Sequence, residues 1–154
     1  MTITTHRRPL AIIAGLLVVV LALGACSSTS DPTSFIRDKY QRESSLDENG
    51  IDAYVAAGKD PEAVATEISA AAQPLDRRTS SQNAAADGGN AVFLQYQKVI
   101  VSIFPYQGGS RVMLGDYRRA HSTYFAFIGG FWASTPGSAG GGSNNRGGGS
   151  GSGK

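Results

Sequence analysis

The residue whose type and position most clearly point to chemistry is Cys26, the single cysteine of the sequence. Leu23 stands three positions before it, and the small residues Gly24 and Ala25 lie between them. In exported lipoproteins the thiol in this setting is the atom that receives the glycerolipid, and the cysteine becomes the first residue of the mature chain. An unpaired cysteine in an exported protein needs an explanation, and lipidation gives one. We predict cleavage between Ala25 and Cys26 and a lipid on the Cys26 sulfur.

The residues before Cys26 have the pattern of a signal peptide. His6, Arg7 and Arg8 make a short positive start, and residues 10–23 are apolar except for Gly15. This apolar run suits a signal peptide and is short for a membrane-spanning helix. Residues 1–25 are therefore predicted to be a lipoprotein signal peptide, with ordinary secretion or an uncleaved helix as alternatives. The predicted location is the outer face of the cytoplasmic membrane.

No other set of residues predicts catalysis, a metal site or a cofactor. His121 is the only histidine after the leader, and Asp116 lies five positions before it. A metal site needs more ligands than these, and a serine nucleophile needs a histidine base oriented by an acid. Ser110 and Ser122 are not in a nucleophile-elbow sequence. An enzyme would require Arg111, Asp116 and His121 to meet in one cleft.

The C-terminal end imitates a phosphate-binding loop by spacing alone. Gly148, Gly153 and Lys154 match the glycine and lysine positions of that motif. A phosphate loop needs a strand before it and a helix after it, so that backbone N–H groups point at the anion. A Gly/Ser-rich stretch precedes these residues instead, so no nucleotide is expected.

Charge also argues against nucleic acid as a partner. Once Arg7 and Arg8 leave with the leader, twelve Lys and Arg residues balance twelve Asp and Glu residues. A neutral chain has no general attraction to polyanions. The local pair Arg118 and Arg119 is either solvated or a contact for lipid phosphates or an acidic partner. The membrane, through the lipid on Cys26, and another envelope or membrane protein are the partners that we expect.

The elements that would position these residues form one small domain. We predict a tether over residues 26–33, a domain over 34–133 and a disordered Gly/Ser-rich tail over 134–154. Helices are predicted over residues 34–45, 61–73 and 116–128, and strands within 91–105 and 110–114. Residues 75–90 are predicted to be a polar loop. The expected α+β fold is a three-stranded antiparallel meander with about three helices on one face, and with residues 51–56 as a candidate fourth short strand.

The last predicted helix and the residues after it are unusually aromatic. Rings in such a run either complete the core or remain on the surface as a protein-binding patch. We keep both alternatives, and the candidate partner contacts are Tyr124, Phe127, Phe131, Trp132, Arg118 and Arg119.

The assembled pattern resembles an uncharacterised, mainly actinobacterial lipoprotein family classed as a domain of unknown function (domain of unknown function 4247). The resemblance rests on Cys26, Phe35, Ile36, Tyr40, Asp76, Arg77, Trp132, residues 64–68, 92–96, 99–101, 109–112 and 116–118, and the Gly-rich end. It implies no activity and no catalytic residue. Relatives encoded beside small membrane proteins and a spermidine-synthase-like enzyme would imply a membrane-associated assembly. We therefore expect a non-enzymatic binding or scaffold lipoprotein, with a small-ligand sensor or carrier as the alternative.

Overall fold

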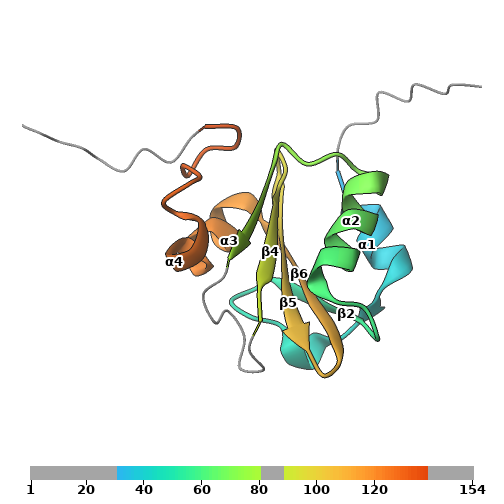
Figure 1. Ribbon diagram of the computed structural model, residues 1–154. Helices are drawn as coiled ribbons and strands as arrows, with labels where there is room; N and C mark the ends of the chain where they lie inside the picture. Colours follow the sequence, from blue (N-terminus) through green and yellow to red (C-terminus); the bar gives the residue numbers. More distant parts are fainter. Residues whose placement is uncertain (1–30, 81–88, 139–154) are drawn as a thin grey trace, which may run out of the picture.

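Six antiparallel strands form one sheet in the order β1-β2-β6-β5-β4-β3 (Figure 1). The computed structural model describes residues 31–80 and 89–138, so the predictions for the leader, Cys26 and the tail beyond residue 138 lie outside it. The strands are β1 (Gln41–Arg42), β2 (Asp52–Ala56), β3 (Asp76–Ser80), β4 (Ala91–Gln95), β5 (Val99–Tyr106) and β6 (Gly109–Asp116). The helices are α1 (Thr33–Lys39), α2 (Pro61–Ala71), α3 (Tyr117–Thr123) and α4 (Phe125–Ile128), with a 3-10 turn η1 (Ser44–Leu46).

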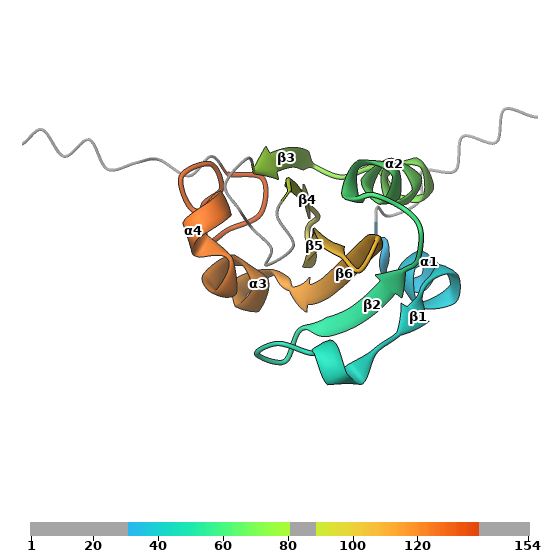
Figure 2. The same cartoon turned by 60° about the horizontal axis from the view of Figure 1, so that its bottom comes forward.

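The predicted three-stranded meander is wrong, and so is the placement of all helices on one face. Helices α1 and α2 cover one face of the sheet, and α3 and α4 cover the other (Figure 2). The chain remains a mixed α+β protein. Strand β5 explains the arrangement, because Val101 and Ile103 pack toward α2 while Ile100 and Phe104 pack toward α3 and α4. A strand buried on both faces is apolar at nearly every position.

The largest error concerns residues 75–90, which were predicted to be a loop. Strand β3 lies within them and pairs with β4 at the edge of the sheet. Its sequence is polar, and its side chains reach helix α2: Arg77 forms an ion pair with Glu62, and the Thr79 hydroxyl donates to the same carboxylate at 3.0 Å. A half-exposed edge strand needs no alternating apolar pattern. The second missed strand, β1, has only two residues.

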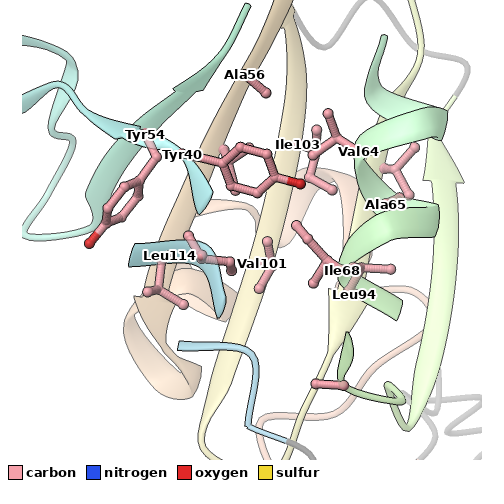
Figure 3. Close-up of a cluster of buried hydrophobic side chains, with 14 of the residues drawn as sticks. Tyr40, Tyr54, Ala56, Val64, Ala65, Ile68, Leu94, Val101, Ile103 and Leu114 are labelled. Carbon is pink, nitrogen blue, oxygen red and sulfur yellow. The ribbon is translucent and has the colours of Figure 1, made fainter. Parts of the chain in front are cut away.

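The first core lies between the sheet and helix α2. Asp60 caps this helix by accepting a hydrogen bond from the Ala63 N–H at 2.8 Å, and Pro61 occupies the first turn, as the sequence predicts. Val64 and Ile68 are completely buried and point toward the sheet (Figure 3). Burying an aliphatic side chain of this size contributes about 1.5–3 kcal/mol. The apolar stripe of α2 therefore holds the helix on the sheet.

The second core is aromatic and lies under α3 and α4. The Phe93 ring meets Phe104 edge-on at 5.8 Å and stacks on Phe127 at 5.8 Å. Tyr124 adds a ring 5.3 Å from Phe104, and Trp132 is 2% exposed. Aromatic pairs at these separations contribute beyond their buried area. The residues after α4 therefore belong to the folded domain.

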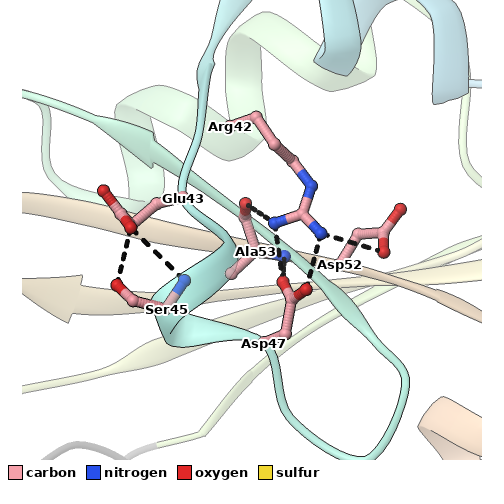
Figure 4. Close-up of polar contacts among 6 residues, drawn as sticks. All are labelled: Arg42, Glu43, Ser45, Asp47, Asp52 and Ala53. Carbon is pink, nitrogen blue, oxygen red and sulfur yellow. Dashed lines mark hydrogen bonds and ion pairs between the residues drawn. The ribbon is translucent and has the colours of Figure 1, made fainter.

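An exposed polar cluster fixes the turn between β1 and β2 (Figure 4). The Arg42 guanidinium donates twice to Asp47 at 2.6 Å and once to the Ala53 carbonyl at 3.0 Å. Asp47 also accepts the Ala53 N–H at 2.9 Å. The Arg42 hydrogen bonds hold the pKa of the Asp47 carboxyl below its usual range. Exposed ion pairs add little stability, so the cluster mainly sets the path of the chain.

Gly109 offers a direct test of the packing between β6 and the end of β2. A Cβ atom at this position would lie 2.5 Å from the Ala56 carbonyl oxygen and 2.9 Å from the Gly58 nitrogen. We expect Gly109→Ala to lower the free energy of unfolding by about 2 kcal/mol, because backbone atoms must move. Gly130→Ala is the control, since no atom lies within 4 Å of its Cβ position. Urea denaturation measures both, and equal stability of the two variants would contradict the packing.

Candidate functional site

A hollow beside α3 and α4 has a volume of about 740 Å³. Asp116 starts α3 by accepting the Arg118 N–H at 3.1 Å, which leaves the Arg118 side chain exposed on the first turn. One turn later His121 faces the same hollow, and Phe125 follows at the start of α4. We name this the Phe125 hollow, and its lining residues are Arg118, His121, Ser122, Phe125, Ser134 and Thr135.

His121 is held in one orientation. Its Nε2 lies 2.9 Å from the Trp132 carbonyl oxygen, and a carbonyl only accepts, so Nε2 carries the hydrogen. The ring stacks on Tyr117 at 6.0 Å and meets Phe125 edge-on at 5.7 Å. Its side chain is 7% exposed, and Nδ1 makes no hydrogen bond to a described residue. The hollow therefore offers a fixed acceptor nitrogen beside a cation and an aromatic ring.

The residues that the sequence offers for catalysis have separate structural roles. A backbone carbonyl orients His121, whereas a catalytic triad uses a carboxylate for this purpose. Ser122 is the next residue along the helix, and adjacent helical side chains do not face each other. Arg111, Asp116 and His121 each have different partners: Arg111 lies over the Phe104 ring at 5.3 Å, and Asp116 caps α3. Within residues 31–80 and 89–138, no three His, Cys, Asp or Glu side chains gather as a metal site.

The predicted partner contacts divide into buried and exposed residues. Tyr124 and Trp132 are 4% and 2% exposed, so their rings belong to the core. Phe127 is half-buried on Phe93. Phe131 is 52% exposed, with the Arg78 guanidinium 5.0 Å from its ring centroid. A partner could reach Phe131 without any change of the fold.

The side chains of the adjacent residues Arg118 and Arg119 point to different parts of the structure. Arg119 points to the loop before β2 and donates to the Asn49 carbonyl at 3.3 Å, whereas Arg118 lines the Phe125 hollow.

Phe125 was not among the partner contacts predicted from the sequence, although it is 59% exposed. Its helical spacing places it among the predicted core positions of residues 116–128. Only the break between α3 and α4 at Tyr124 turns it outward, and no sequence signal marks that break.

A second hollow, of about 330 Å³, lies where β3 begins and β4 ends, and we name it the end hollow. Its lining includes Leu75, Asp76, Gln95, Phe131, Trp132 and Ser138. The Asp76 carboxylate accepts hydrogen bonds from Trp132 Nε1 and from Arg78 Nε, both at 2.8 Å. Burial alone would raise the pKa of the Asp76 carboxyl. These hydrogen bonds outweigh burial and hold that pKa below its usual value of 3.8.

A buried hydrogen-bonded chain joins the end hollow to α3. Gln95 Nε2 donates to the Tyr117 hydroxyl at 2.8 Å, and this hydroxyl donates to the Ala133 carbonyl at 2.9 Å. Burial raises the pKa of Tyr117, and the hydrogen bond from Gln95 partly opposes that rise. The Tyr117 hydroxyl both accepts and donates in this chain, and it connects the backbone after α4 to strand β4.

The family model described as Domain of unknown function (DUF4247) matches residues 19–150, and the chain belongs to this family. No curated protein and no solved structure matches the chain. Among the residues that the structure describes, no helix has the length and apolar character needed to cross a bilayer. Family membership defines the fold unit here and assigns it no activity.

The link between Asp76 and Trp132 predicts a pH-dependent stability. Because the folded-state pKa of Asp76 is lowered, its contribution is present above pH 3.8 and is lost as pH falls through the lower folded-state value. Asp76→Asn should cost about 1 kcal/mol at neutral pH, given partial exposure, and should flatten the acid side of the stability curve. Asp38→Asn on exposed α1 is the control. Parallel curves for wild type and Asp76→Asn would refute the link.

Proposed function

We propose that this chain is an exported lipoprotein, anchored through a glycerolipid on Cys26 to the outer face of the cytoplasmic membrane, that binds another envelope protein without catalysing a reaction. The basic and apolar sequence before residue 24 and the position of the single cysteine support this proposal. A lipid-anchored domain works within a thin layer above the bilayer. Binding a membrane or envelope partner is the function that this placement favours.

The observation that carries the proposal is the exposure of Phe125 beside Arg118 and His121. A phenylalanine that is 59% exposed leaves apolar area in water, and a partner that covers the ring would gain the burial energy. Arg118 would pair with a carboxylate of the partner, and His121 Nδ1 would accept a hydrogen bond. The partner is thus expected to present an acidic group, a donor and an apolar side chain close together. Binding energy at interfaces concentrates in such aromatic and arginine contacts.

The alternative is a small-ligand sensor or carrier that uses the same hollow. Its volume of about 740 Å³ lies within the range of about 300–1,000 Å³ typical of ligand pockets. The same groups would select an acidic ligand with an apolar portion. A thermal-shift screen of the full chain with carboxylates of this kind separates the two readings. A shift that Arg118→Ala abolishes would favour the carrier.

Partner binding should depend on Phe125 and Arg118. We expect Phe125→Ala or Arg118→Ala to weaken the complex at least about tenfold, or about 1.4 kcal/mol. Quantitative co-purification of the tagged full chain from detergent-solubilised membranes, followed by affinity measurement with the purified partner, tests this. Lys39→Ala, an exposed charge on α1, should leave the complex intact.

The melting temperature of each variant controls for folding. Phe125→Ala and Arg118→Ala should both melt within a few degrees of wild type, since both side chains are exposed. Identical partner yields from wild type and from both variants would rule out the Phe125 hollow as the binding surface.

A further inference from the structure

Both ends of the described chain lie at the same end of the molecule (Figure 1). Asp31, the first described residue, lies within electrostatic reach of Lys98 in the turn between β4 and β5. Ser138, the last described residue, lines the end hollow with Leu75 and Gln95. The turn between β5 and β6, at Gln107, lies at the opposite end of the sheet (Figure 1).

The distance from Cys26 to Asp31 is limited by covalent geometry. Five peptide links separate the two Cα atoms, and they span at most about 18 Å. If Cys26 is lipidated, as proposed above, Asp31 is held within this distance of the bilayer surface. The tether therefore keeps the end of the domain that contains Asp31, Lys98 and the end hollow near the membrane.

This end also presents apolar side chains to solvent. Among the described residues, the large apolar side chains that are exposed are Leu75 at 46%, Phe125 at 59% and Phe131 at 52%. Leu75 and Phe131 line the same hollow, although 56 residues of sequence separate them. Leu75 and Phe131 belong to two segments that are joined by the hydrogen bond from Trp132 Nε1 to Asp76. The exposed apolar pair is thus a fixed feature of the fold.

We propose that Leu75 and Phe131 insert into the bilayer interface, so that the domain docks on the membrane as well as being tethered to it. The inference rests on the proposed lipid anchor. Phenylalanine and leucine are the side chains that interfacial proteins bury about 5–10 Å into the headgroup boundary. In this docked position the Arg78 guanidinium, which lies over the Phe131 ring, would be close to the headgroup phosphates. A lipid anchor and an apolar contact together hold more firmly than one alone.

Charge at this end favours an apolar contact over an electrostatic one. Arg37, Lys98 and Arg78 are accompanied by Asp31 and Asp76, which leaves an excess of one positive charge. An excess this small gains little from anionic lipid. Docking should therefore be almost insensitive to salt and to the fraction of phosphatidylglycerol. The docked orientation points the turn at Gln107 away from the bilayer.

The single tryptophan, Trp132, is a reporter at the end hollow. The lipidated full chain is reconstituted into phosphatidylcholine–phosphatidylglycerol vesicles with and without lipids brominated on the upper acyl chain, which quench tryptophan at short range. We expect strong quenching of Trp132, unchanged in high salt. Leu75→Ser with Phe131→Ser should lose most of it, and Leu75→Ser alone should lose part. Tyr106→Ser, near the opposite end, should lose none.

Flotation of the same samples separates failure of the anchor from failure of docking. Protein that floats with vesicles while Trp132 is unquenched would overturn docking and leave the anchor standing. Protein that does not float would remove the anchor, and docking with it. Quenching that the serine variants do not reduce would also overturn the inference. So would variants that lose only a protein partner in native membranes, because the surface would then bind protein.

Discussion

The hydrogen bond between Trp132 and Asp76 lies at the centre of the region that forms the two proposed binding surfaces. The indole Nε1 donates to Asp76 at the start of the edge strand, while the backbone carbonyl of the same tryptophan accepts from His121 Nε2. One residue therefore shapes both the end hollow and the Phe125 hollow. Because the indole is almost completely buried, Trp132 anchors the otherwise largely exposed segment after α4 on the domain.

Sequence patterns predicted the elements whose burial follows a simple period. Helix α2, with its capping Asp60 and apolar stripe, and the strands around residues 91–114 belong to this group. Strand β3 was missed because an edge strand that bonds α2 through charged side chains has no apolar alternation. The position of α3 on the opposite face was missed because periodicity shows which side of a helix is apolar and leaves open which face of a sheet it covers. The apolar run in β5 contained that information, since such a strand must be covered on both faces.

The candidate surfaces were harder to predict for a related reason. Tyr124, Phe125, Phe127 and Trp132 are equally apolar, and their exposure depends on the break between α3 and α4 and on the fold of the chain over the sheet. Tyr124 and Trp132 are buried in the core, whereas Phe125 and Phe131 are exposed to solvent. Spacing alone cannot divide such a cluster, because the division is a tertiary property.

The two exposed surfaces fit one arrangement at a membrane. In the proposed arrangement the end hollow would face the bilayer to which the anchor leads, while the Phe125 hollow, which residues of α3 and α4 line, would remain accessible to a neighbouring protein. The formal charge balance of residues 26–154 agrees with a protein that uses local contacts and no long-range attraction.

The whole arrangement depends on the covalent state of Cys26, so the mass of the protein isolated from membranes is the most direct measurement. The account predicts a mature chain that begins at Cys26 and carries the added mass of a diacylglyceryl group on that residue. A membrane-extracted chain that retains residues 1–25, or that has an unmodified Cys26 thiol, would contradict it.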